Sequence, residues 1–133
     1  MMSELVFVYG TLKSGQSNYP LIQDLVRFTM NASIHGKLYD LGPYPAVIPG
    51  QASVYGELVA FTDFAEAIRR MDDLEDYYGP GHPSNEYDRL LIAAKTSDGL
   101  EHSCYCYFYK DALSVSASGK FLKNGIWPDP SRQ

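Results

Sequence analysis

A run of carboxylates in the middle of the chain is the first candidate for acid–base chemistry. Asp72-Asp73-Leu74-Glu75-Asp76 places four acidic residues within five positions, and most runs of this kind form a solvated surface. Glu75 differs because it follows Leu74 and lies four residues after Met71, so it borders the apolar face of a predicted helix. Apolar surroundings and neighbouring carboxylates raise a carboxyl pKa, which suits a general acid/base near neutral pH.

The loop after the first apolar run is the second candidate. Residues 5–9 (LVFVY) predict a buried strand that ends at Gly10. A glycine-containing loop at this point can direct successive backbone N–H groups at a carboxylate or a developing oxyanion. We therefore interpret Tyr9, Gly10, Thr11 and Leu12 as a substrate cradle, with a purely structural turn as the alternative. Neither a Walker phosphate loop nor a dinucleotide-binding glycine pattern is present, so ATP and NAD are not indicated.

Metal-dependent and covalent mechanisms have little support in the sequence. Cys104 and Cys106 lie one residue apart in a predicted strand, where they share a face without disulfide geometry. His35, His82 and His102 are scattered without the spacing of metal ligands. No Ser-His-Asp or Cys-His arrangement stands out, so we expect neither a metal site nor a covalent nucleophile.

One helix is predicted after residue 63. Asp63, followed three residues later by Glu66, resembles a capping box that would begin this helix. Apolar residues then recur at helical spacing along one face: Phe64, Ala67, Ile68, Met71 and Leu74.

The remaining segments predict mainly strands. Strands are expected over residues 5–9, 32–41, 46–48, 53–61, 87–96 and 100–109, and a short helix over 19–28. Turns are indicated at Pro49-Gly50 and Ser97-Asp98-Gly99, a surface loop over 77–86, and an irregular tail over about 124–133. These elements predict one α+β domain over residues 1–133, with a small mixed or antiparallel β-barrel-like sheet flanked by helices.

Composition restricts the partners. The chain has 133 residues, a formal net charge of −5 and 20% charged residues, as in ordinary globular proteins. Its longest basic cluster is Arg69-Arg70, which argues against nucleic acid. Residues 1–9 resemble neither a signal peptide nor a membrane span, so we expect a cytoplasmic protein without membrane contact.

Several short motifs occur in one consistent order. They are Val8–Lys13 (VYGTLK), Gly36–Asp40 (GKLYD), Tyr44-Pro45-Ala46, Gly56-Glu57-Leu58, Met71–Glu75 (MDDLE), Tyr87-Asp88-Arg89, Tyr107 and Asn124–Trp127 (NGIW). Each motif is weak alone, but the series covers nearly the whole chain. In this series the chain resembles gamma-glutamylcyclotransferase-like proteins of the gamma-glutamylamine cyclotransferase and AIG2-like type.

The resemblance implies an activity and roles for particular residues. The family converts a γ-glutamyl amine or amino acid to 5-oxoproline by intramolecular attack, without a cofactor. Glu75 would be the catalytic carboxyl group, residues 9–12 would bind the substrate, and Tyr107 would line the pocket through its hydroxyl. The partner would be a small γ-glutamyl molecule and the protein a monomer or homodimer. Asp76 stands where the family usually has glycine, which leaves the substrate and its leaving group open.

Two other functions fit the same residues. A non-catalytic domain of this fold could bind a small acidic metabolite in the cradle. A protein-interaction module could instead expose the tyrosines that alternate along one predicted strand, Tyr105, Tyr107 and Tyr109.

Overall fold

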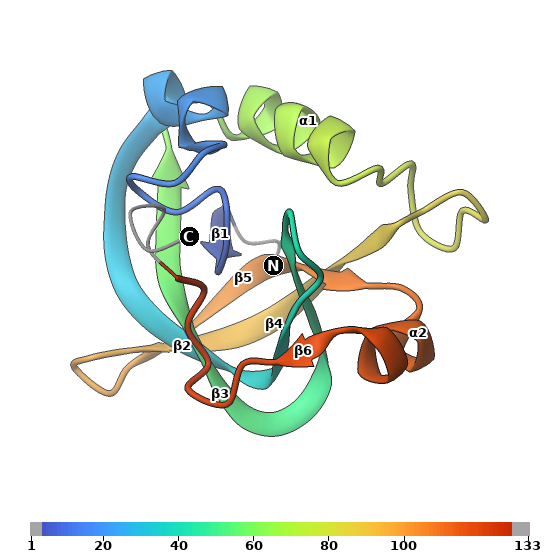
Figure 1. Ribbon diagram of the computed structural model, residues 1–133. Helices are drawn as coiled ribbons and strands as arrows, with labels where there is room; N and C mark the ends of the chain where they lie inside the picture. Colours follow the sequence, from blue (N-terminus) through green and yellow to red (C-terminus); the bar gives the residue numbers. More distant parts are fainter. Residues whose placement is uncertain (1–3, 129–133) are drawn as a thin grey trace.

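The computed structural model describes residues 4–128, most of which form a β-barrel and two helices (Figure 1). The strands are β1 (Leu5–Val8), β2 (Val26–Asp40), β3 (Pro45–Phe61), β4 (Tyr87–Thr96), β5 (Glu101–Tyr109) and the short β6 (Lys120–Phe121). The helices are α1 (Phe64–Leu74) and α2 (Ala112–Ser118), and two 3-10 turns, Tyr19–Leu21 and Gln23–Leu25, precede β2.

Pairing between β2 and β3 closes the barrel. The strand order is β3-β1-β5-β4-β2-β6, and the additional β3–β2 ladder gives each of the first five strands at least two neighbours. β1 runs parallel to β5, whereas the other ladders are antiparallel. The predicted α+β class and the small mixed barrel are therefore confirmed. Closure leaves none of these five strands as a free sheet edge.

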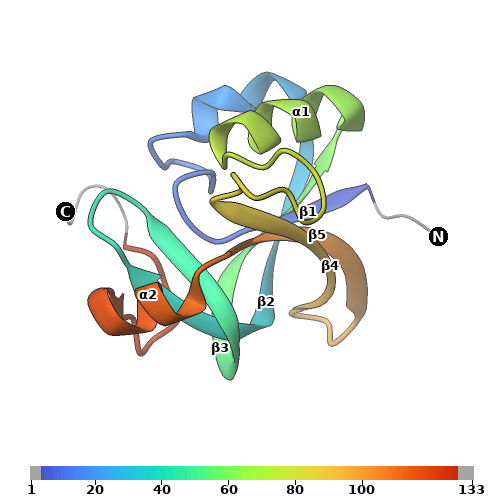
Figure 2. The ribbon, with the colours of Figure 1, turned by 90° about the vertical axis from the view of Figure 1, so that its right-hand side faces the viewer.

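The first strand is buried on both sides, which explains its unbroken apolar sequence. Phe7 points into the barrel, where it joins Leu58 and Cys106 in the central core. Val6 and Val8 point outward and are covered by α1 and its neighbours. Figures 1 and 2 show α1 over this part of the barrel, with α2 beside the long β2–β3 hairpin at the other end. The residue that follows β1 is thus delivered to the boundary between the barrel and α1.

The predicted helix after residue 63 is present as α1. The Asp63 carboxylate accepts a hydrogen bond from the Glu66 backbone N–H at 3.1 Å, so it caps the helix as expected. The Glu66 side chain pairs with Arg69 and Arg70 instead of completing a capping box. Ala67 and Met71 are fully buried on the face toward the barrel.

The prediction of two strands over 46–48 and 53–61, joined by a turn at Pro49-Gly50, is wrong. β3 runs through Pro49-Gly50, and its hairpin partner is β2, which it reaches through residues 41–44. The register between the strands shifts at Gly36, because Lys37 lies opposite Ile48 while His35 lies opposite Ser53. The extra residues around Pro49 form an irregularity within the ladder, as prolines in sheets often do.

The predicted helix over 19–28 is also wrong. Only the two 3-10 turns form there, and β2 begins at Val26 because Val26 and Phe28 pair with Phe61 and Ala60 of β3. Long-range pairing therefore overrides a weak local period. The hairpin of β4 and β5, in contrast, turns at residues 97–100 as predicted, with Gly99 at φ 84°.

Helix α2 and strand β6 were not predicted. Within ALSVSAS only Val115 is buried, so the local apolar period is faint. Neither helix of residues 4–128 has the length and apolarity to cross a lipid bilayer. Residues 124–128 are irregular, as expected, and the rest of the predicted irregular tail lies outside the described residues.

Close contact at Gly56 gives a prediction about stability. A Cβ at this position of β3 would lie 2.2 Å from the Val8 carbonyl oxygen and 2.9 Å from the Phe7 ring. Gly56→Ala should therefore displace β1 and lower the free energy of unfolding by about 1–3 kcal/mol. Urea denaturation would measure this loss. Gly99→Asn is the control, because no atom lies within 4 Å there and asparagine tolerates positive φ. Equal stability of wild type and Gly56→Ala would contradict the prediction.

Candidate active site

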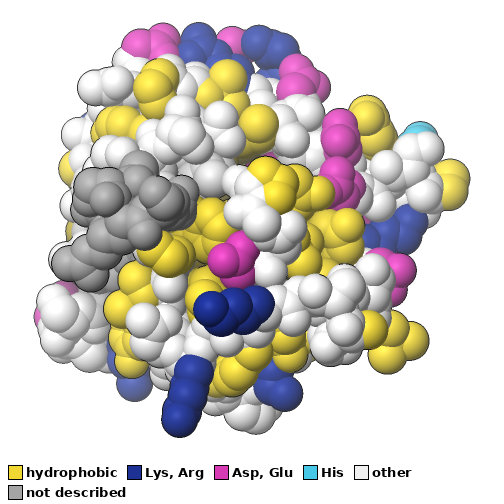
Figure 3. All heavy atoms as spheres, in the orientation of Figure 1, with side chains coloured by type: hydrophobic (Ala, Val, Ile, Leu, Met, Phe, Trp, Pro, Cys, Tyr) yellow, Lys and Arg dark blue, Asp and Glu magenta, His cyan; other side chains and the backbone are white. Residues whose placement is uncertain are grey.

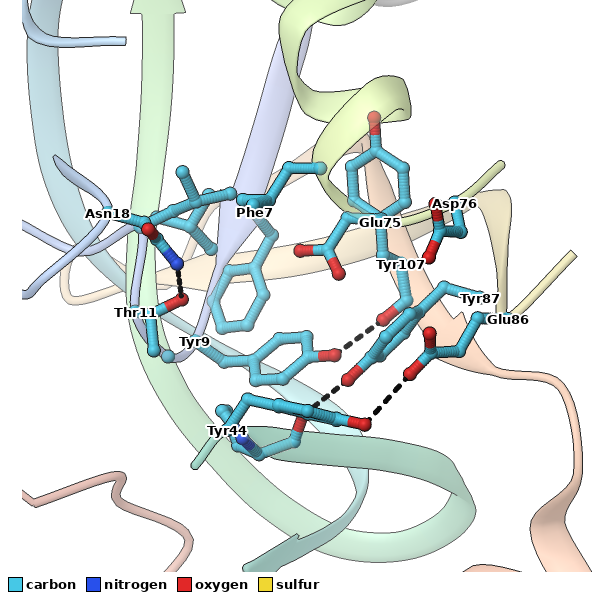
Figure 4. A pocket seen from close by; sticks show the side chains of 15 residues that line it. Phe7, Tyr9, Thr11, Asn18, Tyr44, Glu75, Asp76, Glu86, Tyr87 and Tyr107 are labelled. Atoms are coloured by element: carbon cyan, nitrogen blue, oxygen red, sulfur yellow. Dashed lines mark hydrogen bonds between the residues drawn. The ribbon is translucent and has the colours of Figure 1, made fainter. Parts of the chain in front are cut away.

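A cavity of about 260 Å³ lies where the end of β1, the end of α1 and the start of β4 meet (Figure 4). All six residues predicted for the site line it: Tyr9, Gly10, Thr11, Leu12, Glu75 and Tyr107. They come from three separate parts of the chain, and the fold brings them together. In Figure 4 Thr11 stands on one side, Asp76 and Glu86 on the other, and the Glu75 carboxyl between them.

The cradle is a tight loop with unpaired donors. The Lys13 N–H donates to the Gly10 carbonyl at 3.0 Å, and Asn18 holds Thr11 through both its backbone N–H (2.8 Å) and its side-chain amide (2.9 Å). The N–H groups of Gly10, Thr11 and Leu12 donate to no acceptor within residues 4–128. Successive free N–H groups beside a cavity can bind an anion.

Neighbouring elements fix the position of the cradle. A Cβ on Gly10 would lie 2.3 Å from the Pro45 ring, so only glycine allows this approach. Farther along the loop, the Ser14 N–H and hydroxyl donate to the Glu57 carboxylate at 2.9 and 3.0 Å. The donors are therefore held in place before any ligand arrives.

Glu75 occupies the C-cap of α1, with its backbone N–H bonded to the Met71 carbonyl at 2.9 Å. Its side chain points into the cavity, and the carboxyl forms no hydrogen bond with any part of the chain that the structure describes. Burial raises the pKa of Glu75 to about 8, and the negative charges of Glu86 and Asp76 act in the same direction. The carboxyl is thus able to take up and return a proton near neutral pH.

Three tyrosine hydroxyls around the cavity donate hydrogen bonds to other groups of the protein. Tyr9 donates to the Tyr107 carbonyl at 2.7 Å, Tyr87 donates to the Pro45 carbonyl at 2.8 Å, and Tyr44 donates to Glu86 at 3.0 Å. Burial raises the pKa of Tyr9 and Tyr87 above that of free tyrosine, so both stay neutral. These rings act as walls whose hydroxyl oxygens remain available as acceptors.

Tyr107 differs from its predicted role. It borders the cavity, but its hydroxyl points away and donates to Asp72 at 2.6 Å. Asp72 also accepts from Arg89 at 2.6 Å, and the Arg89 guanidinium lies over the rings of Tyr77 (5.0 Å) and Tyr105 (5.3 Å). Burial raises the pKa of Asp72, while the Tyr107 hydrogen bond and the Arg89 charge lower it. This cluster anchors the last turn of α1 to β4 and β5, three residues before Glu75.

Sequence reasoning missed several lining residues: Asn18, Tyr44, Pro45, Asp76, Glu86 and Tyr87. Tyr44, Pro45 and Tyr87 belong to the motifs quoted above, and that was the available signal. No sequence signal pointed to Glu86, because it ends a loop whose path is set by long-range contacts. A larger, more open depression of about 1030 Å³ lies near Lys13 and Trp127, but Glu75 does not border it.

Comparison with known proteins identifies the family of the chain. A family model described as gamma-glutamyl cyclotransferase, AIG2-like, matches residues 6–129. Gamma-L-glutamyl-butirosin B gamma-glutamyl cyclotransferase of Niallia circulans is 35% identical over 105 residues, covering 78% of this chain and 65% of that protein. The chain thus spans slightly less than two thirds of that relative. The gamma-glutamylcyclotransferase family protein YtfP of Escherichia coli K12 is 31% identical over 127 residues, covering 88% and 95%.

Solved structures show the same architecture. The solution structure of ytfP from Escherichia coli aligns with a TM-score of 0.58 and 28% identity, over 96% of this chain and 98% of that one. The crystal structure of an uncharacterized protein from Pyrococcus horikoshii aligns with a TM-score of 0.67 and 19% identity, over 94% and 90%, which is a likeness of fold alone. Since the family model covers most of the sequence and the barrel is shared, this chain belongs to the gamma-glutamyl cyclotransferase, AIG2-like family.

Proposed function

We propose that the protein converts a γ-glutamyl amine or γ-glutamyl amino acid to 5-oxoproline and the free amine, with Glu75 as general acid/base and without a cofactor. One observation carries this proposal. An unpaired carboxyl with a pKa of about 8 points into a cavity that is also lined by Gly10, Thr11 and Leu12, whose backbone N–H groups donate to no acceptor within residues 4–128. A proton acceptor and an anion cradle in one cavity suit a reaction at a carbonyl next to a charged group.

The proposed reaction is an intramolecular exchange of amides. The substrate's α-amine nitrogen attacks its own γ-carbonyl carbon, and the bond from that carbon to the leaving nitrogen breaks. Glu75 takes one proton from the attacking nitrogen and returns one to the leaving nitrogen, so no proton is gained or lost overall. The enzyme must hold the folded-back conformer, and well-oriented intramolecular attack is worth up to roughly 7–11 kcal/mol.

The cradle has the second role in this mechanism. The N–H groups of Gly10, Thr11 and Leu12 would bind the α-carboxylate of the substrate or the oxyanion that develops on the γ-carbonyl. Tyr9 and Tyr87 would limit the space around the glutamyl chain, which favours the bent conformer. The name of the Niallia relative, a cyclotransferase for a γ-glutamylated compound, supports the same chemistry here.

The position of Glu75 favours catalysis over simple metabolite binding. A carboxylate in the pocket of an anionic ligand repels that ligand unless it is protonated, so a binding module gains nothing from it. The interaction-module hypothesis has less support, because Tyr107 is buried and Tyr105 stacks on Phe64 with ring centroids 6.0 Å apart.

A product assay tests the proposal. Purified protein would be incubated with γ-glutamyl amines, γ-glutamyl amino acids and glutathione, and 5-oxoproline and released amine would be quantified by mass spectrometry. We expect the two products in equal amounts from at least one class. Release of free glutamate in place of 5-oxoproline, or no product from any class by a folded protein, would contradict the proposed reaction.

A further inference from the structure

The wall of the cavity opposite the cradle is acidic and aromatic. In Figure 4 Asp76 and Glu86 lie on this side, next to Tyr44 and Tyr87. We infer that Asp76 and Glu86 form an ammonium-binding subsite, so that the preferred substrate releases an amine that carries a second positive charge. This inference rests on the proposed function, since it assigns the leaving-group side of the same cavity.

Backbone contacts place the two carboxylates together. The Glu86 N–H donates to the Asp76 carbonyl at 3.0 Å, which joins the two ends of the loop after α1. One oxygen of each carboxylate accepts a tyrosine hydroxyl: Glu86 from Tyr44 at 3.0 Å and Asp76 from Tyr78 at 3.2 Å. Their second oxygens accept no hydrogen bond from residues 4–128. The pair therefore retains acceptors for a ligand.

Asp76 and Glu86 differ from the other acidic residues near α1, which form ion pairs with arginines. Around α1, arginines neutralise Glu66, Asp73, Asp24 and Asp72 in ion pairs of 2.6–3.2 Å. Figure 3 shows this mixture of acidic and basic side chains over the top of the molecule. Within residues 4–128, neither Asp76 nor Glu86 forms an ion pair, although both are partly buried. Partly buried carboxylates without a cation lose solvation that a bound ammonium group would restore.

The rest of the cavity provides a second, independent indication of a ligand. Glu75 presents an unpartnered carboxyl to the same space, and its raised pKa registers the charges of both Glu86 and Asp76. The lining residues include no lysine, arginine or histidine. An anionic leaving group would meet three carboxyl groups there, whereas a cationic one would meet only favourable charges.

The orientation of the substrate follows from the two walls. Binding of the glutamyl carboxylate at residues 10–12 directs the leaving nitrogen past Glu75 toward Tyr44 and Tyr87, whose ring centroids are 6.5 Å apart. Aromatic faces accommodate a methylene chain and attract an ammonium group. The geometry thus fits a γ-glutamyl derivative of a diamine, with an apolar stem between its two nitrogens.

Two substrates of equal length test the subsite. The probes are the γ-glutamyl derivatives of 1,4-diaminobutane and of butylamine, which differ only in the terminal ammonium group. We expect kcat/KM of the wild type to favour the diamine derivative by about 5- to 20-fold at low salt, as two partly exposed charge contacts allow. Glu86→Gln and Asp76→Asn should each reduce this ratio, and the double variant should bring it near one.

The variants are chosen to preserve local structure. In Glu86→Gln the side-chain carbonyl would still accept from the Tyr44 hydroxyl, and asparagine tolerates the left-handed φ of 51° at position 76. Asp73→Asn is the matched control, because it removes the same charge from an exposed side chain outside the cavity. It should leave the ratio unchanged. A wild-type ratio of one or less, or a ratio that Asp73→Asn lowers as much as the cavity variants do, would overturn the subsite.

A binding measurement separates the subsite from the reaction. Absence of turnover with both probes would count against the proposed function alone. The affinity of 1,4-diaminobutane and of butylamine would then be measured by NMR titration for the wild type and the double variant. Tighter binding of the diamine, lost in the double variant, would support the subsite. Equal binding of the two amines, or no change in the double variant, would refute it.

Discussion

Glu75→Gln is expected to lower the rate of 5-oxoproline formation by about 10²- to 10⁴-fold, which is the usual contribution of a positioned acid/base. Glutamine has nearly the same shape but cannot exchange a proton. In the wild type, kcat/KM should rise with pH through an apparent pKa near 8, because only the ionised carboxyl takes a proton from the amine. The residual kcat/KM of the variant should not show this rise with pH. Stopped assays from pH 6 to pH 9.5 would measure both effects.

The same substitution should stabilise the folded protein at alkaline pH. The pKa of Glu75 rises from 4.5 to about 8 on folding, so folding favours its protonated form. Glu75 does not affect the free energy of unfolding below about pH 4.5, where it is protonated in both states. Between pH 4.5 and 8 it increasingly destabilises the folded state, and the destabilisation is largest above pH 8. Removing the charge should then raise the free energy of unfolding by up to about 4 kcal/mol at high pH. Urea denaturation at pH 5 and pH 8.5 would show this difference.

The control separates local from general charge effects. Asp73→Asn removes an exposed carboxylate of the same helix, and we expect little change in rate or in the pH dependence of stability. Full turnover by a folded Glu75→Gln variant would refute the catalytic assignment. Equal stability of wild type and Glu75→Gln at both pH values would instead show that the carboxyl is well solvated.

Arg89→Met should lower both stability and rate, although Arg89 does not border the cavity. The substitution leaves Asp72 without its cation in a position that is only 22% exposed, which costs about 1–3 kcal/mol of unfolding free energy. Because Asp72 anchors the turn that carries Glu75, a shift of about 1 Å in the carboxyl would lower kcat by up to about 10²-fold. Denaturation and steady-state kinetics would measure the two losses.

A double-mutant cycle tests whether this effect passes through Asp72. Asp72→Asn combined with Arg89→Met should cost less than the sum of the single variants, because the second change no longer leaves a charge unpaired. Arg69→Met is a suitable control, since its side chain is 61% exposed and pairs with acids on the outer face of α1. Strict additivity of the two losses in kcat would show that Arg89 acts independently of Asp72.

The parts of the site that the sequence predicted are those governed by local rules. Helix α1 follows from its period and from the Asp63 cap, and the border of its apolar face indicated that Glu75 points inward. The cradle follows from the strand that ends at Gly10. In both cases the signals that define the element lie within a few residues, so a local pattern was sufficient to predict it, although Pro45 and Glu57 then hold the cradle in position.

The features that were missed depend on distant partners. Pro49-Gly50 has the composition of a turn, but pairing of β3 with β2 on both sides of it extends the strand. Glu86 enters the cavity because its backbone bonds to Asp76 across the intervening loop. The Tyr107 hydroxyl points toward Asp72 and not into the cavity. Strand periodicity predicts the face on which a side chain lies, but not which polar partner its hydroxyl contacts. Each outcome was decided by contacts that local sequence patterns do not encode.

The parallel pairing of β1 with β5 has a consequence for how the protein matures. Tyr9 donates its hydroxyl hydrogen bond to Tyr107, 98 residues farther along the chain, so the wall of the cavity joins two segments that are distant in sequence. During synthesis, β1 and its loop must wait until β5 has left the ribosome. Such high contact order predicts slow folding, and the wall that Tyr9 and Tyr107 share cannot form in a growing chain before β5 has been made.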